Sequence, residues 1–504
     1  MRNLAFAALL LFSCDSGDKY TTGFGAAVGD PLNASVGQGG AQDFGEFRSI
    51  LEEGNIPAPG ILDDVGFFNE HSVPMPLPDC GQDLCVHGLL GVLQNMINGA
   101  DCTVVLVGMN TPIDVETMQR PPLNLTVVVD ASGSMEGSPI ESVRTGLSAM
   151  LAELEPDDRL SVVTFNADAE VLFQDLPSDD SEVQDQIDAL IADGRTNLYE
   201  GLRIGFQVAE EHHDPTRQNR LLLLSDGMTT EGITASDRIL ALAEGYNARG
   251  YGLSTVGVGT EFDTHLVSTL AELGGGAFYY LEDAGAIEEV FTEEINSFLV
   301  PLARDVELTI DVEDGWFLGG FYGTNLSEVD GSRVTVTLPS VQLAHRFSES
   351  DNELGRRGGG GAMLLELVPT DGDGTGEVGV LRTDYELVST GANQSQRIDI
   401  MAPPDAEPGW VFDRSVEKGF VMLNLYTAFD MASRSCAAGE WEDALAVLDA
   451  VGTAAREWLD NEEEPDPDIS DDLIYVDLFM ANIEARSGVV LTPGRVAADP
   501  WPVD

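Results

Sequence analysis

Three short motifs carry five oxygen-bearing side chains, and each motif borders an expected strand or helix. The first is DASGS at 130–134, which directly follows the apolar run 123–129. The second is GRTN at 194–197, and the third is SDG at 225–227, after the apolar run 221–224. A hard divalent cation prefers carboxylate, hydroxyl and water oxygens in a near-octahedral array. These motifs could therefore hold one such ion if the fold brings them together.

Residues 121–302 alternate apolar runs with amphipathic helical runs, the pattern of a parallel sheet covered on both faces. We expect strands over 123–129, 160–165, 170–173, 221–224, 253–258 and 277–280, the third forming an antiparallel edge pair. Helices are expected over 140–154, 182–191, 198–211, 235–249, 264–273 and 286–298. Doubly wound, Rossmann-like sheets bind ligands at the carboxyl ends of their strands, where strand order reverses. The three motifs should meet there, and Gly133 lets the backbone fold closely around an ion.

This set of motifs, in this order and on these elements, resembles the metal-ion-dependent adhesion site of von Willebrand factor A (VWA) domains. The resemblance implies one divalent cation, Mg²⁺, with Mn²⁺ or Ca²⁺ as alternatives. It implies that Ser132 and Ser134 ligate the ion directly, and that Thr196 does so directly or through water. Asp130 and Asp226 would bind directly or hold coordinating waters. One coordination position would remain for an acidic residue of a protein partner.

A second resemblance lies before this domain. The stretch FRSILEEGNIP at 47–57, with the residues up to Pro78, is similar to the N-terminal region of bacterial VWA lipoproteins of the YfbK type. In that family a similar stretch precedes the VWA domain. The regions after the domain resemble the family's C-terminal part less specifically. This likeness implies an architecture more than a function.

The remaining chain divides by composition. Residues 43–120 form an N-terminal region with helices near 44–51 and 61–68, an apolar run at 88–96 that is a strand or a helix, and a strand at 103–109. Residues 303–405 indicate a β-sandwich with strands over 306–312, 333–338, 362–367 and 378–387 and a mobile loop at 348–361. Residues 406–490 indicate a helical hairpin packed on it, built from helices 414–433, 441–458 and 473–485, before a tail at 491–504. Strands 103–109 and 306–312 could share one sandwich, which would make the VWA domain an insertion.

The first residues predict export. Residues 4–12 are apolar but too short to span a bilayer, which takes about 20 residues. LFSC at 11–14 resembles a bacterial lipobox, which implies that 1–14 is a lipoprotein signal peptide and that Cys14 is lipidated. An ordinary cleaved signal is the alternative. Residues 15–42 are rich in Gly, Ala and Ser and are expected to form a flexible tether. We therefore expect a protein anchored in the cell envelope, on the periplasmic face or the cell surface.

Four further cysteines are Cys80, Cys85, Cys102 and Cys436. An even number in an exported chain permits two disulfides with three connectivities. A zinc site near His87 is the rival interpretation, although the spacing fits no zinc knuckle.

The net charge and the lack of a recognisable catalytic motif argue against nucleic-acid binding and against an enzyme. The chain has 87 acidic and 25 basic residues, a net charge of −62, which repels nucleic acid. No serine–histidine–carboxylate or cysteine–histidine set presents itself, so we expect no enzyme. DGDGTG at 371–376 imitates an EF-hand loop, but Arg382 stands where that loop needs Glu. The sequence predicts a metal-dependent protein-binding or adhesion module in the envelope; the alternative is a structural scaffold whose metal site is not used for binding. It leaves the oligomeric state open.

Overall fold

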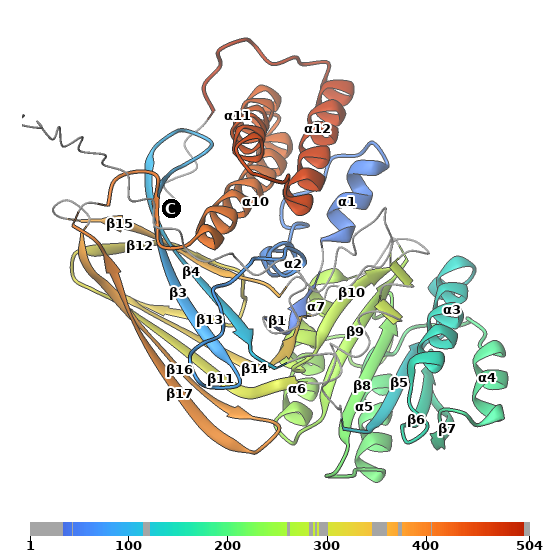
Figure 1. Ribbon diagram of the computed structural model, residues 1–504. Helices are drawn as coiled ribbons and strands as arrows, with labels where there is room; N and C mark the ends of the chain where they lie inside the picture. The colour runs from blue at the N-terminus through green and yellow to red at the C-terminus, as the bar shows by residue number, and fades with distance from the viewer. Residues whose placement is uncertain are drawn as a thin grey trace, which may run out of the picture.

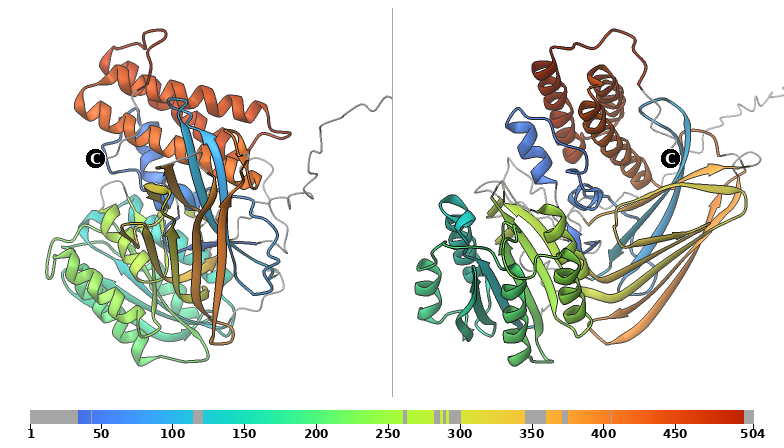
Figure 2. Two further views of the ribbon diagram at one scale, coloured as in Figure 1. Left: turned by 90° about the vertical axis from the view of Figure 1, so that its left-hand side faces the viewer. Right: turned by 180° about the vertical axis from the view of Figure 1, so that it is seen from behind.

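Two sheets and a layer of helices build the molecule (Figures 1 and 2). The computed structural model describes residues 34–42, 44–113, 121–259, 263–281, 286–287, 290–291, 301–344, 360–370, 375–404 and 406–497. The predicted signal peptide, Cys14, most of the tether, most of helix 286–298 and most of loop 348–361 lie outside these residues, as do four residues of the motif 371–376. In Figure 1 an α/β domain lies at the lower right, a β-sandwich at the lower left and the C-terminal helices above both.

The α/β domain contains a seven-stranded sheet in the order β2-β10-β9-β8-β5-β6-β7. Its strands are β2 (Gly40–Ala41), β5 (Leu123–Asp130), β6 (Arg159–Phe165), β7 (Ala169–Pro177), β8 (Gln218–Ser225), β9 (Gly252–Val258) and β10 (Ala277–Leu281). All pair in parallel except β7, which is antiparallel to β6. The six predicted strands and the antiparallel edge pair are therefore confirmed.

Helices cover both faces of this sheet. Successive strand residues point to opposite faces, so Val127 and Val129 join one core with α3 (Ser138–Glu153) and α4 (Ser181–Asp188). Val128 joins the other core with α5 (Leu198–Glu211), α6 (Ser236–Asn247) and α7 (Thr264–Leu273). The doubly wound fold is confirmed.

Two helical glycines in this domain predict opposite effects of one substitution. A Cβ at Gly201 in α5 would lie 2.5 Å from the Phe165 ring, whereas one at Gly245 in α6 would meet nothing within 4 Å. Gly201→Ala should overpack the contact and lower the free energy of unfolding by about 1–3 kcal/mol. Gly245→Ala should raise it by about 0.5–1 kcal/mol, because glycine loses more backbone entropy in a helix. Urea denaturation of both variants measures this; stabilisation of equal size in the two would contradict the tight packing of α5.

The second sheet is antiparallel, has eleven strands and folds into a sandwich around one core. Its main path is β12-β15-β4-β1-β14-β11-β16-β17, with β13, β18 and β3 attached. The strands are β1 (Ala34–Gln38), β3 (Cys85–Gln94), β4 (Asp101–Thr111), β11 (Pro301–Val312), β12 (Trp316–Tyr322), β13 (Ser327–Asp330), β14 (Arg333–Leu343), β15 (Met363–Pro369), β16 (Gly376–Leu387), β17 (Ala392–Ala402) and β18 (Trp410–Val411). The apolar run 88–96 lies mostly in β3, in a hairpin with β4, so the helical alternative is wrong.

The α/β domain is inserted into this sandwich. The chain passes from the sandwich into the α/β domain after β4 and returns to the sandwich at β11. Both strands belong to one sheet, with β1 and β14 between them. The predicted sharing of a sandwich by residues before and after the domain is confirmed, although the two strands are not direct neighbours.

Residues 34–41 join the two sheets, so the prediction of a flexible tether over 15–42 is wrong for this part. β1 pairs with β4 and β14 of the sandwich, and β2, one residue later, pairs with β10 of the α/β domain. A Cβ at the intervening Gly39 would lie 2.6 Å from the carbonyl oxygen of Gly276. The small residues are therefore required by close approach between backbones.

Five helices form the helical layer. They are α1 (Gly45–Glu52), α2 (Asp64–Glu70), α10 (Arg414–Ala438), α11 (Trp441–Asp460) and α12 (Pro467–Ser487). They share a core with Val104, Leu106 and Leu364 of the sandwich sheet. Helix α10 joins this layer to the sandwich sheet by packing on β3 and β4. The predicted C-terminal hairpin is a three-helix group. None of the helices in the described ranges has a stretch apolar and long enough to cross a bilayer.

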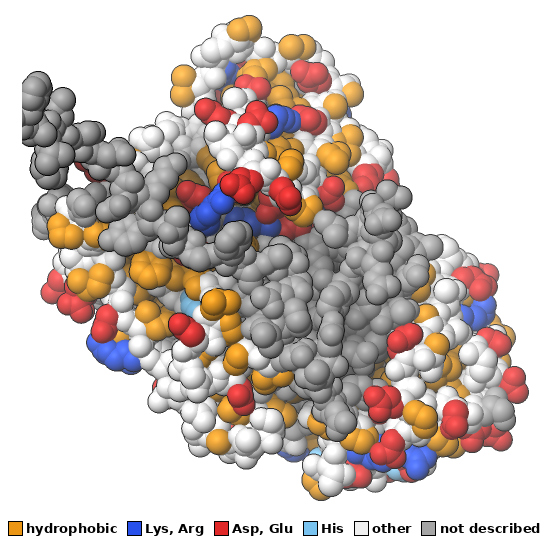
Figure 3. All heavy atoms as spheres, in the orientation of Figure 1, with side chains coloured by type: hydrophobic (Ala, Val, Ile, Leu, Met, Phe, Trp, Pro, Cys, Tyr) orange, Lys and Arg blue, Asp and Glu red, His pale blue; other side chains and the backbone are white. Residues whose placement is uncertain are grey.

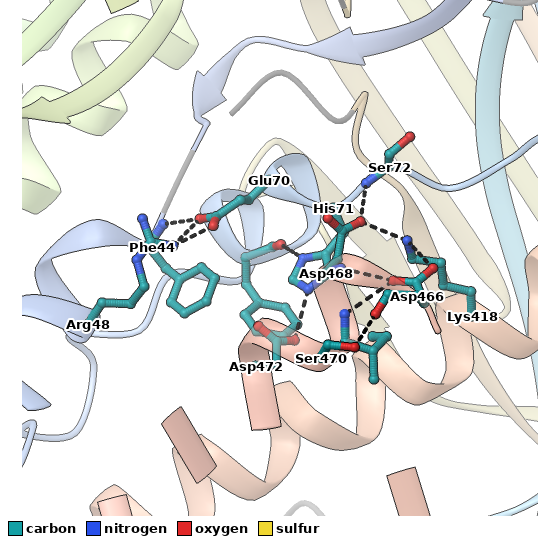
Figure 4. Close-up of polar contacts among 12 residues, drawn as sticks. Phe44, Arg48, Glu70, His71, Ser72, Lys418, Asp466, Asp468, Ser470 and Asp472 are labelled. Carbon is teal, nitrogen blue, oxygen red and sulfur yellow. Dashed lines mark hydrogen bonds and ion pairs between the residues drawn. The ribbon is translucent and has the colours of Figure 1, made fainter. Parts of the chain in front are cut away.

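Buried ion pairs tie α12 to α10 and to the end of α2 (Figure 4). Lys418 Nζ lies 2.7 Å from Asp468 Oδ2 and 2.8 Å from Asp466 Oδ2. His71 Nε2 lies 2.8 Å from Asp472 Oδ2. Burial alone would lower the pKa of His71, but the carboxylates of Asp472 and Asp468 raise it to about 9. His71 and Asp472, which are 401 residues apart in sequence, are thus held together by an ion pair.

The cysteines are only partly paired. Cys80 and Cys85 form a disulfide, which removes both from the alternative zinc site. Cys102 and Cys436 are free and buried, so the prediction of a second disulfide is wrong. Cys102 instead contacts Glu366 Oε1 at 3.4 Å.

Candidate metal site

Three loops meet at the carboxyl ends of β5 and β8. The first, after β5, contains a short 3₁₀ turn at Gly133–Met135. Gly133 N donates to the carbonyl oxygen of Gly194 at 3.0 Å, and Asp193 N donates to that of Ala131 at 2.8 Å. The third loop follows β8 and reaches the second, because Thr230 N donates to the carbonyl oxygen of Thr196 at 2.9 Å. The three predicted motifs therefore lie together at one edge of the sheet.

Side-chain hydrogen bonds connect the first and third loops. Ser132 N donates to Asp130 Oδ1 at 2.9 Å, and the hydroxyl oxygens of Ser132 and Ser134 are 3.0 Å apart. Ser225 Oγ of the third motif donates to Asp130 Oδ2 at 2.6 Å, and the Ser134 side chain interacts with the Asp226 carboxylate. Both serine hydroxyls and both carboxylates thus belong to one continuous polar group.

The two carboxylates lie in a place that disfavours their negative charge. Asp130 is 0% and Asp226 4% exposed. Burial raises the pKa of Asp130 to about 6, an effect that the nearby Asp226 charge increases and the hydrogen bond from Ser225 reduces. Burial also raises the pKa of Asp226. A bound dication would favour the ionised form of both groups.

Thr196 occupies the second loop, just before α5. The residue is 3% exposed, and its amide donates to Thr230 Oγ1 at 3.0 Å. Its own hydroxyl has no hydrogen-bond partner among the described residues. The adjoining Asn197 caps α5 by accepting from Glu200 N at 3.3 Å. The backbone of this loop is thus fixed while the threonine hydroxyl remains available to a ligand.

The donor chemistry fits a hard cation. The polar group offers two carboxylates and three hydroxyls and contains no sulfur or nitrogen ligand, which favours Mg²⁺ over softer metals. Gly133 permits the close approach of the first two loops, because a Cβ there would lie 3.1 Å from the carbonyl oxygen of Gly194. The residues that would hold the ion are Asp130, Ser132, Ser134, Thr196 and Asp226.

Two supporting residues were missed from the sequence. Ser225 Oγ donates to Asp130 Oδ2 at 2.6 Å, so the serine of the SDG motif orients the first carboxylate. Thr230 holds the backbone of Thr196, as described above. The position of Ser225 beside Asp226 in the motif was an available signal; Thr230 gave none.

Other metal-ligand combinations receive no support from the described residues. No group of three or more His, Cys, Asp and Glu side chains in the described ranges is arranged to hold a metal. His87 Nε2 is 2.7 Å from Asn110 Oδ1 instead of facing a cysteine.

Comparisons with known proteins find a von Willebrand factor type A domain in this chain. Residues 124–293 match the family model for the von Willebrand factor type A domain. The YfbK protein of Escherichia coli (strain K12) is 28% identical over 206 residues, which cover 40% of this chain and 36% of that protein. The sll0103 protein of Synechocystis sp. is 33% identical over 178 residues, which cover 35% of this chain and 41% of that protein. The chain thus spans less than half the length of either relative. A solved von Willebrand factor type A protein from Catenulispora acidiphila has a TM-score of 0.49 at 14% identity, covering 74% of this chain and 86% of that one.

Proposed function

This chain contains a VWA domain over residues 124–293, and from that premise we propose that it is a metal-ion-dependent protein-binding module anchored in the bacterial cell envelope. The domain would use one divalent cation, Mg²⁺ first among the candidates, to capture an acidic residue of a partner. The observation that supports this most is the meeting of the three predicted motifs at one sheet edge. We assign no catalytic step to the chain.

The cation would supply the attraction that the protein itself lacks. The chain carries a net charge of −62, so an acidic partner residue is repelled at long range. A bound dication is the largest local charge and reverses the field close by. Ser132, Ser134 and Thr196 would hold it through hydroxyl oxygens, and Asp130 and Asp226 directly or through water. A carboxylate oxygen of the partner would complete the coordination.

Anchoring would come from the lipid on Cys14, which would become the first residue of the mature protein after the signal peptide is removed. The part of the predicted tether that would remain is 15–33, since β1 begins at Ala34. The binding edge would then stay close to the membrane that holds the protein.

Capture from an envelope extract tests the binding role. The immobilised full chain should retain a partner in Mg²⁺ and release it with EDTA, because the partner's carboxylate would lose its counter-charge. Asp130→Ala should retain none above background at any Mg²⁺ concentration. Asp185→Ala, on the exposed face of α4, is the matched control and should behave as wild type.

Retention that EDTA and Asp130→Ala both leave unchanged would contradict the metal-dependent role. It would favour the alternative, in which the VWA domain is a structural scaffold and another surface binds.

A further inference from the structure

We infer that the partner presents its acidic residue within a basic segment, with lysine or arginine a few positions away on either side. This inference rests on the proposed function and concerns which partners the site accepts. It comes from the acidic residues that surround the candidate metal site, which we call the rim: Glu136, Asp168, Asp193, Glu231 and Asp263.

Backbone contacts place the rim beside the metal-site loops. Glu136 N donates to the carbonyl oxygen of Gly133 at 3.3 Å, and Asp193 lies next to Gly194 on the loop that contacts Gly133. Glu231 N donates to the carbonyl oxygen of Thr196 at 3.0 Å.

The other two rim residues come from neighbouring loops. Asp168 accepts from Asn166 N at 2.9 Å through its backbone, and the carbonyl of Asn166 accepts from Asn197 N at 2.7 Å. Backbone atoms of Asp263 lie 3.4 Å from a Cβ built on Gly227, the residue after Asp226. All five residues therefore flank the same edge of the sheet.

The rim is solvent-accessible and only slightly neutralised. Glu136, Asp168, Asp193 and Asp263 are exposed, and the Glu231 side chain is 41% exposed. Within 130–137, 166–168, 193–197 and 226–233 the one basic residue is Arg195, whose guanidinium is 3.7 Å from Glu231. Acidic side chains are spread over much of the face drawn in Figure 3. The five rim residues differ from the rest in that their loops adjoin the metal-site loops.

The charge balance at this edge then selects the partner. The charge of a bound dication equals the summed negative charge of ionised Asp130 and Asp226. The nearest charges beyond the ion are then the five rim carboxylates and the Arg195 guanidinium. A partner's flanking residues lie within about one Debye length, roughly 8 Å, of these groups and are not fully screened. Acidic flanks would be repelled and basic flanks attracted, while the central carboxylate still reaches the ion.

One apolar contact is available beside the ion. Met228 is 46% exposed and its amide donates to Asp226 Oδ1 at 3.1 Å. An aliphatic stem of a flanking lysine or arginine could cover it while the charged head reaches the rim. Lysine and arginine could thus contact both the exposed Met228 side chain and the acidic rim.

A peptide library tests this directly. Bead-displayed peptides with a fixed central Asp and random flanks are incubated with the full chain in Mg²⁺ and released with EDTA. Lysine and arginine should be enriched about two- to fivefold at flanking positions, the range expected for exposed ion pairs. The enrichment should fall in high salt.

Two variants with equal changes in net charge test whether the preference for basic flanks comes from the rim or from the charge of the whole chain. Glu136→Lys, Asp193→Lys and Glu231→Lys together should abolish the preference for basic flanks. Glu328→Lys, Asp330→Lys and Asp384→Lys, on exposed positions of the sandwich, change the net charge equally and should leave it intact.

The outcomes separate this inference from the proposed function. EDTA-released peptides with neutral or acidic flanks would overturn the inference and leave metal-dependent binding standing. Basic flanks that persist in the rim variant would overturn it too, because the net charge of the chain would then be the cause. Failure to enrich any EDTA-released peptide would count against metal-dependent capture of a carboxylate and against the inference with it.

Discussion

Lys418→Met is expected to lower the free energy of unfolding by about 3–5 kcal/mol, the usual result of removing one partner from a buried ion pair. The Lys418 side chain is 6% exposed and lies within 2.8 Å of carboxylates of Asp466 and Asp468. Methionine fills a similar volume but removes the cation that lies 2.7 Å from Asp468 Oδ2, and the Asp468 side chain is only 5% exposed. Denaturant unfolding followed by helix circular dichroism measures the change.

The same helix supplies the control. Arg434 pairs with Asp430 at 2.7 Å, but its side chain is 70% exposed. Arg434→Met should therefore change the stability by less than about 1 kcal/mol. Adding Asp468→Asn to Lys418→Met should recover part of the loss, because it removes a buried negative charge that the lysine no longer neutralises. Equal small effects of Lys418→Met and Arg434→Met would show that the ion pairs in Figure 4 do not hold α12 in place.

Mg²⁺ at 100 times its dissociation constant should stabilise the wild-type protein by about 2.7 kcal/mol, and Asp130→Ala should remove this effect entirely. The reason is that a cation bound only by the folded state shifts the unfolding equilibrium. Without metal, Asp130→Ala should unfold within about 1 kcal/mol of wild type. The hydrogen bonds lost from Ser132 N and Ser225 Oγ are offset because a buried carboxylate close to Asp226 is also removed.

Thermal unfolding with and without Mg²⁺ measures both parts of this prediction, and Asp185→Ala again serves as the control with full stabilisation. A large loss of stability in metal-free Asp130→Ala would show that the carboxylate supports the fold itself. Full Mg²⁺ stabilisation of that variant would place the cation elsewhere.

The candidate site was predictable from sequence because its residues stand next to strongly apolar strands. Runs such as 123–129 and 221–224 fix β5 and β8, and parallel strands bring their carboxyl ends together. The second motif could be placed because it directly precedes an amphipathic helix, whose N-terminus follows from the sequence pattern. The hydroxyl of Ser225 was overlooked because hydrogen-bond partners within a loop depend on side-chain orientation, which spacing alone does not specify.

The N-terminal strands could not be recognised by composition. Residues 34–41 contain small residues, which usually indicate flexibility, yet Gly39 and its neighbours are small because two sheets approach each other there.

Strand β17 was missed for a different reason: Asn393–Arg397 alternate between half-buried and exposed polar side chains, so no apolar alternation marks that part as a strand. In β12 two glycines and a register shift between Leu318 and Gly320 hide the strand.

Cysteine number was a poor guide to pairing. Cys102 and Cys436 face the same helical core, but each is surrounded by apolar side chains, and Cys102 is turned toward Glu366. An even count permits a disulfide without bringing two sulfur atoms into contact.

Electron paramagnetic resonance of Mn²⁺, titrated into the full chain at physiological ionic strength, tests the central claim most directly. Five oxygen-bearing side chains from three loops should bind one Mn²⁺ per chain, and Mg²⁺ should displace it. That bound signal should be lost in Asp130→Ala and weakened in Thr196→Ala, with Asp185→Ala unchanged. Binding of the same stoichiometry and affinity in Asp130→Ala would contradict the assignment of the metal to this edge of the sheet.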